Sequence, residues 1–76
     1  MSNILSDIAR DILADWAKPH FAAKPYLGAM LEMRSIQDNY GYDDGRDVVL
    51  RFLANAGGWR GAKAREIKKM LRAMVV

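Results

Sequence analysis

Residues 5–16 read LSDIARDILADW. Apolar side chains recur along this stretch every three or four residues, the spacing of one face of an α-helix; they are Leu5, Ile8, Ala9, Ile12, Leu13 and Trp16. Ser2 or Asn3 is suited to cap the start of this helix. Lys18-Pro19 is expected to end it, because proline disfavours the helical conformation in the preceding residue. The stretch predicts an amphipathic helix with Trp16 in the core.

Three more helices are predicted further along the chain. Pro25 suits the first turn of a second helix, and Asp43 or Asp44 suits the N-cap of a third. Residues 55–58, NAGG, are expected to end the third helix, because asparagine and glycine accept the left-handed conformation of a C-terminal cap. A fourth helix is expected to start at residues 60–62. The side chains expected on the buried faces are Leu27, Met30, Leu31 and the stem of Arg34; Val48, Val49, Phe52 and Leu53; and Ile67, Met70, Leu71 and Met74.

The segments between these helices do not divide the chain. Residues 38–45, DNYGYDDG, are dense in turn formers and predict a loop. No internal repeat, low-complexity tract or linker occurs, so we expect a single helical domain over 1–76, an all-α compact bundle of about four short helices. A domain of this size buries only about 60% of the surface of its unfolded chain. Dimerisation would therefore help, and the sequence leaves monomer and homodimer open.

Charge is divided unevenly along the chain. Residues 1–55 hold six Lys/Arg and eight Asp/Glu, whereas residues 56–76 hold six Lys/Arg and one glutamate. On a helical wheel, most basic residues of the fourth helix lie opposite its apolar side. This basic face is a candidate to contact nucleic-acid phosphates, an acidic protein or only solvent, through Lys63, Arg65, Lys68, Lys69 and Arg72.

Composition argues against several classes of protein. The chain has no cysteine, which excludes disulfides and cysteine-ligated metals and fits a reducing compartment. No apolar run approaches the roughly 20 residues that span a bilayer, and residues 1–7 lack the basic start and long apolar stretch of a secretory signal. We expect a cytoplasmic protein that has no membrane partner.

Catalytic and cofactor motifs are not apparent. His20 is the only histidine, and no serine or cysteine motif surrounds it. The loop of residues 38–45 carries three aspartates, but its tyrosines and Asp43 do not follow the EF-hand order of oxygen ligands and glycine. The glycines match neither the P-loop nor the dinucleotide fingerprint. We therefore predict a protein without enzyme activity, metal or cofactor.

Three aspartates recur every four residues along the first helix, at Asp7, Asp11 and Asp15. Like charges at this spacing repel by about a few tenths of a kcal/mol. Two interpretations stay open. The aspartates face solvent, with a favourable helix dipole near Asp7, or they face basic residues of the fourth helix or of a partner.

The third and fourth helices with their turn partly match a helix-turn-helix motif. Ala54 and Gly58 have the spacing of its small residue and turn glycine, and Trp59 supplies an apolar position. Gly57 and Ala64, however, fall where larger apolar residues are usual. A plain αα-hairpin has the same outline and is the favoured interpretation.

Aromatic residues supply the remaining candidate contacts. Tyr40 and Tyr42 lie in the predicted loop, where they either fold back onto the domain or anchor a partner, as tyrosines do at interfaces. Trp59 and Arg60 lie in the turn before the fourth helix. These four residues are the candidate partner contacts.

Five segments together resemble small hypothetical proteins of phages and prophages: DWAKP (15–19), PYLGAM (25–30), YGYD (40–43), FLANA (52–56) and WRG (59–61). The resemblance implies a protein that binds and inhibits or redirects a host protein, including components of host defence, and it assigns no residue a role. Our leading hypothesis is thus a small non-enzymatic interaction protein. The alternative is a nucleic-acid-binding regulator that uses the fourth helix.

Overall fold

Each apolar stripe of the sequence forms a helix in the computed structural model, which describes residues 4–40 and 43–76, with the backbone alone at positions 40 and 43. The expected all-α bundle of four helices is confirmed for this part of the chain. One short hairpin lies within the segment expected to be a loop. The elements in chain order are α1 (Leu5–Asp15), α2 (Lys24–Met30), β1 (Asn39–Tyr40), β2 (Asp43–Asp44), α3 (Gly45–Ala54) and α4 (Ala62–Met74).

The start of α1 is satisfied by backbone rather than by a side chain. The N–H groups of its first two residues donate to the carbonyl oxygens of Arg34 and Met33, each at 2.9 Å. These contacts satisfy donors that a helix leaves free at its N-terminus. Ile4 takes the N-cap position, and the predicted caps, Ser2 and Asn3, lie outside the described residues.

The end of α1 is decided by a tertiary contact. The helix stops at Asp15, before the expected end at Lys18-Pro19. Trp16 leaves the helical conformation, with φ −108° and ψ 81°, and its ring stacks on that of Trp59 at 6.0 Å and 8°. Trp16 is half-buried and packs against the core, so its expected place inside the core is only partly right.

The starts of α2 and α3 agree with the sequence. Pro25 lies in the first turn of α2, and the carboxylate of Asp44 accepts the N–H of Asp47 at 2.8 Å as the N-cap of α3. One expectation for α2 is wrong. Because the helix ends at Met30, Arg34 lies beyond it and its side chain is exposed rather than packed on the apolar face.

The connection from α3 to α4 has the predicted position and a different conformation. Asn55 follows the end of α3 with φ −110°, so the left-handed cap expected within residues 55–58 does not form. The positive φ of this connection, 110°, belongs to Gly61, which is the N-cap of α4. A residue with a Cβ is strained at this φ, which explains a glycine immediately before the helix.

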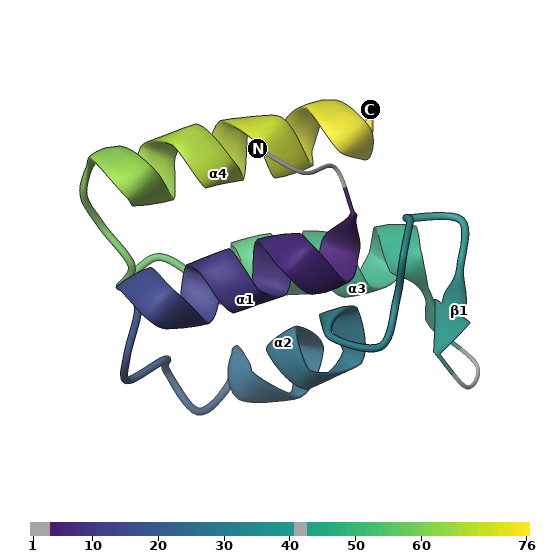
Figure 1. Ribbon diagram of the computed structural model, residues 1–76, viewed down its shortest axis with the longest axis horizontal. Helices are drawn as coiled ribbons and strands as arrows, with labels where there is room; N and C mark the ends of the chain where they lie inside the picture. The colour runs from purple at the N-terminus through teal and green to yellow at the C-terminus, as the bar shows by residue number, and fades with distance from the viewer. Residues whose placement is uncertain (1–3, 41–42) are drawn as a thin grey trace.

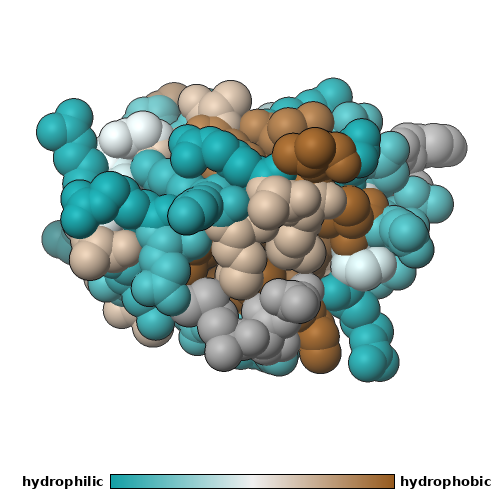
Figure 2. Space-filling view, turned by 90° about the horizontal axis from the view of Figure 1, so that it is seen from above, coloured by the Kyte–Doolittle hydropathy of each residue, from teal (hydrophilic) through white to brown (hydrophobic). Residues whose placement is uncertain are grey.

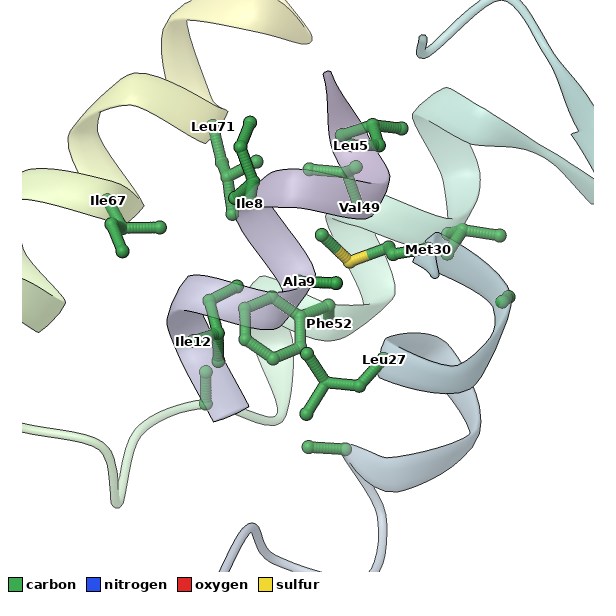
Figure 3. Close-up of a cluster of buried hydrophobic side chains, with 14 of the residues drawn as sticks. Leu5, Ile8, Ala9, Ile12, Leu27, Met30, Val49, Phe52, Ile67 and Leu71 are labelled. Carbon is green, nitrogen blue, oxygen red and sulfur yellow. The ribbon is translucent and has the colours of Figure 1, made fainter. Parts of the chain in front are cut away.

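The four helices bury their apolar faces in one cluster. In Figure 1, α1 lies between α2 and α4 with α3 behind it, and α1 packs against α2 and α4. Figure 3 shows the side chains that converge there: Leu5, Ile8, Ala9, Ile12, Leu27, Met30, Val49, Phe52, Ile67 and Leu71. No polar or charged side chain is buried in the described residues. The polar chemistry of this part of the chain therefore lies at the surface.

Candidate functional site

The basic residues of α4 gather on its outward face. Ala64, Ile67 and Leu71 are buried against the bundle, which turns the opposite side of the helix to solvent. Figure 2 looks down on α4 and shows hydrophilic side chains where the helix begins and hydrophobic ones toward its C-terminal end. We name five exposed cations the basic surface: Arg65, Lys69 and Arg72 on this face, Arg60 in the connection before α4, and Lys63 in its first turn, on the side of the buried Ile67.

No described carboxylate forms an ion pair with a residue of the basic surface. Arg10 offers a contrast, because it pairs with Asp7 of the same helix at 2.8 Å. Glu66, the acidic residue of α4, is exposed and lies to the side of the Arg65, Lys69 and Arg72 row. No described carboxylate therefore neutralises the charge of the basic surface by an ion pair.

Lys68 is not part of this surface, although the sequence placed it there. Its ammonium donates to the carbonyl oxygens of Ala56 at 2.7 Å and Trp59 at 2.6 Å, and lies 5.8 Å from the centroid of the Trp59 ring. The pKa of Lys68 is lowered by desolvation and by the positive charges of Arg72 and Arg60. Lys68 is thus a half-buried tie between α4 and the turn before it, and its role as a phosphate contact stays a prediction.

Trp59 is likewise structural. Its side chain is only 2% exposed, and its Nε1–H donates to the carboxylate of Asp15 at 2.8 Å. The rings of Trp16 and Phe52 lie against it. The prediction of Trp59 as a partner contact is wrong, because the residue joins the end of α1 to the connection before α4. Arg60, the next residue, is exposed as expected.

The aspartates of α1 have separate roles. Asp7 pairs with Arg10, and Asp15 accepts the indole N–H of Trp59. No ion pair joins them to the cations of α4 in the described residues, so the interpretation that pairs them with the fourth helix is not observed there. A local ion pair at Asp7 and a tertiary hydrogen bond at Asp15 offset the repulsion along the helix.

The side chains of two candidate residues are not described by the structure. Tyr42 is outside the described residues, and for Tyr40 the backbone alone is described, as part of β1. The prediction that these tyrosines anchor a partner is therefore untested. It stays a prediction.

An open groove of about 550 Å³ lies beside the last turns of α4. One wall is the turn of residues 35–37, and the other consists of Met70, Ala73 and Met74. The expected burial of both methionines is only partly right, because they are half-buried against the core. Sequence reasoning missed the groove because its walls lie more than 30 residues apart in the chain.

Phe21 is a second surface feature that the sequence did not indicate. Its side chain is 78% exposed, and its ring lies 4.6 Å from that of His20. His20 is held in turn by the N–H of Ala22, which donates to its Nδ1 at 3.2 Å. His20 therefore has a local structural partner, and an exposed phenyl ring marks the connection between α1 and α2.

The outline of α3 and α4 is that of an αα-hairpin. The two helices pack on each other and run in opposite directions along the molecule (Figure 1). A helix-turn-helix motif instead sets its helices at about 90–120° across a turn of about 3–4 residues. Residues 55–61, which join α3 to α4, exceed that length. The hairpin interpretation agrees with this geometry.

Two further features bear on the class of protein. Over residues 4–40 and 43–76, no group of three or more His, Cys, Asp or Glu side chains is placed to hold a metal ion. In the same part of the chain, each helix is too short or too polar to cross a membrane.

Comparison with known protein families, curated proteins and solved structures finds no match in any of the three.

Proposed function

We propose that this chain is a non-enzymatic interaction protein, and that its basic surface binds an acidic surface of a partner protein. The observation that carries the proposal is the exposure of Arg60, Lys63, Arg65, Lys69 and Arg72 without an ion-pair partner among the described carboxylates. Charges of one sign on one face steer and orient a partner of opposite charge.

The groove favours a protein over a nucleic acid as the partner. Met70, Ala73 and Met74 place apolar surface directly beside Lys69 and Arg72. Phosphates require only the cations, whereas a protein interface combines an apolar centre with a polar rim. The arrangement on α4 has both parts.

The resemblance to phage and prophage proteins extends the proposal to the source of the partner. On this reading the acidic surface belongs to a host protein, and the interaction inhibits or redirects that protein. Components of host defence are included in this class. The small size of the chain suits such a role, because binding one face of a partner requires no catalytic apparatus.

Charge reversal on α4 tests the proposal. We expect Arg65→Glu/Lys69→Glu to lose about tenfold or more in affinity for the host protein that the native chain captures. The matched control is Lys18→Glu/Lys24→Glu, which makes the same change of charge at exposed positions away from α4. Equal affinity of the two variants would refute the role of the basic surface.

The second candidate function is nucleic-acid binding by the same face. It is favoured by the row of Arg65, Lys69 and Arg72, which no carboxylate interrupts. It requires that the affinity for random-sequence DNA fall with salt in proportion to the number of phosphates contacted. Absence of binding to duplex and single-stranded DNA at low salt would remove this candidate.

A further inference from the structure

The groove beside α4 has one wall that is fixed in place. The N–H of Arg46 donates to the carbonyl of Ile36 at 3.1 Å, and the carboxylate of Asp38 accepts the N–H groups of Arg34 at 2.8 Å and Ser35 at 3.4 Å. A Cβ at Gly45 would lie 2.7 Å from the backbone of the same turn. The turn of residues 35–37 is therefore packed tightly on the start of α3, and a preformed wall lowers the cost of binding.

The other wall is adaptable. Met70 and Met74 are half-buried, and Ala73 between them is exposed. Methionine side chains are flexible and polarizable, and they are common on surfaces that accept varied apolar partners. The groove volume of about 550 Å³ is several times the roughly 150 Å³ in which an apolar protein cavity holds benzene. The groove thus has room for apolar side chains of a partner.

The α4 side of the groove is more basic than acidic. Lys69 and Arg72 lie on α4 within one turn of Ala73. On the opposite side, Arg34 directly precedes the turn, and the guanidinium of Arg46 reaches the main-chain oxygen of Val76 at 3.3 Å. Carboxylates lie on this side too: that of Asp38 accepts backbone N–H groups, and Asp44 and Asp47 flank Arg46 at the start of α3. On α4, Glu66 lies one turn before Met70, beside two cations. The cations of α4 therefore favour an anionic occupant.

We infer that the groove receives the apolar face of an acidic amphipathic helix from the partner protein, an inference that rests on the proposed function. Apolar side chains of that helix insert between the 35–37 turn and α4, and its carboxylates meet Lys69 and Arg72. The walls carry no aromatic side chain and no strand edge, so they suit neither a polyproline segment nor an added strand, whereas an apolar groove beside a basic helix face suits an acidic amphipathic helix.

A second copy of this chain does not supply the occupant. The acidic amphipathic helix of the described chain is α1, and its apolar side chains Leu5, Ile8 and Ile12 are fully buried in its own core. Freeing them would require unfolding. The occupant therefore comes from another protein.

Binding of a defined peptide tests the inference. The probe is a synthetic peptide of about 15 residues, a length at which an isolated helix begins to be stable, with leucines on one helical face and glutamates elsewhere. We expect its binding to shift the methyl resonances of Met70 and Met74 in the NMR spectrum of the full chain. Met30 and Met33 are buried, so their resonances serve as internal controls. A scrambled peptide of the same composition should bind about tenfold more weakly or less.

Two variants separate the effect of blocking the groove from the effect of the added charge. Ala73→Glu places a carboxylate in the groove, and Ala62→Glu adds the same charge at an exposed position at the start of α4. We expect Ala73→Glu to lose about tenfold or more in peptide affinity and Ala62→Glu to lose little. Equal losses of peptide affinity in the two variants, or equal affinity for the scrambled peptide, would refute binding in the groove without refuting the role of the basic surface. A homodimer that Ala73→Glu dissociates would also overturn the inference, whereas failure of the α4 charge reversal overturns the proposed function.

Discussion

The two ends of α4 are built differently. Toward its start, the ammonium of Lys68 reaches back from the middle of the helix to two carbonyl oxygens of the preceding connection, and the ring of Trp59 is buried in that connection. At its end, Met70 and Met74 border an open groove, and Val76 is 97% exposed. Polar and aromatic contacts hold the first end, while apolar surface stays uncovered at the second. Under the proposed function, one helix therefore separates the contacts that stabilise the fold from the surface that binds a partner.

The largest effect on the free energy of unfolding should come from Trp59, in the connection before α4. Trp59→Ala removes a buried ring and the indole N–H that Asp15 accepts, and we expect it to lose about 3–5 kcal/mol of the free energy of unfolding. A loss of that size is most of the stability of a small domain. Urea denaturation followed by far-UV circular dichroism measures it.

Phe21→Ala is the control for this prediction. It also deletes an aromatic ring, but one that is 78% exposed, so the change in stability should stay within about 0.5 kcal/mol. Similar losses in Trp59→Ala and Phe21→Ala would contradict the anchoring role of Trp59.

The second prediction concerns the rigid wall of the groove. Gly45→Ala would bring a Cβ within 2.7 Å of the Ile36 Cα and the Ser35 carbonyl oxygen, which are backbone atoms and move only with the turn. We expect a loss of about 1–3 kcal/mol, the usual cost of overpacking. Gly28→Ala is the matched control: a Cβ there meets nothing within 4 Å, and the helix should gain about 0.5–1 kcal/mol. Thermal denaturation of both variants distinguishes them, and a stabilised Gly45→Ala would show that the wall is loose.

Local patterns predicted the helices of this fold well. The period of the apolar residues placed Ile8, Phe52 and Ile67 in the core, because helical spacing alone determines which side chains share a face. Pro25 and Asp44 marked helix starts correctly, since their preferences depend on backbone geometry within one turn.

The site was harder to predict, because its parts are set by contacts between distant segments. Trp59 follows two glycines in a turn, and its burial depends on Trp16 and Asp15 far earlier in the chain. The helical wheel put Lys68 with the other cations, whereas the carbonyl oxygens of Ala56 and of Trp59 hold its ammonium. No local pattern contains these partners, so sequence alone grouped Lys68 with the solvent-facing cations.

The smallest effect on the free energy of unfolding should come from Lys68. Lys68→Met keeps most of the side-chain length and removes the donor to two carbonyl oxygens, and because the site is half-buried we expect a loss of about 1 kcal/mol. Lys69→Met, on the exposed side of α4, should change stability by less than about 0.5 kcal/mol. Equal effects in urea denaturation would contradict the tie that Lys68 makes.

The pH dependence of stability, compared between the native chain and Lys68→Met, gives a sharper test. Desolvation first, then Arg72 and Arg60, lower the pKa of Lys68 in the folded protein. Between this pKa and the higher pKa of the unfolded chain, the unfolded chain binds more protons at Lys68, so this group makes the free energy of unfolding rise with pH. The stability of the native chain should therefore increase relative to Lys68→Met as the pH rises through the alkaline range. The opposite trend would mean that the two carbonyl acceptors, which favour the charged form, outweigh the desolvation and the neighbouring arginines.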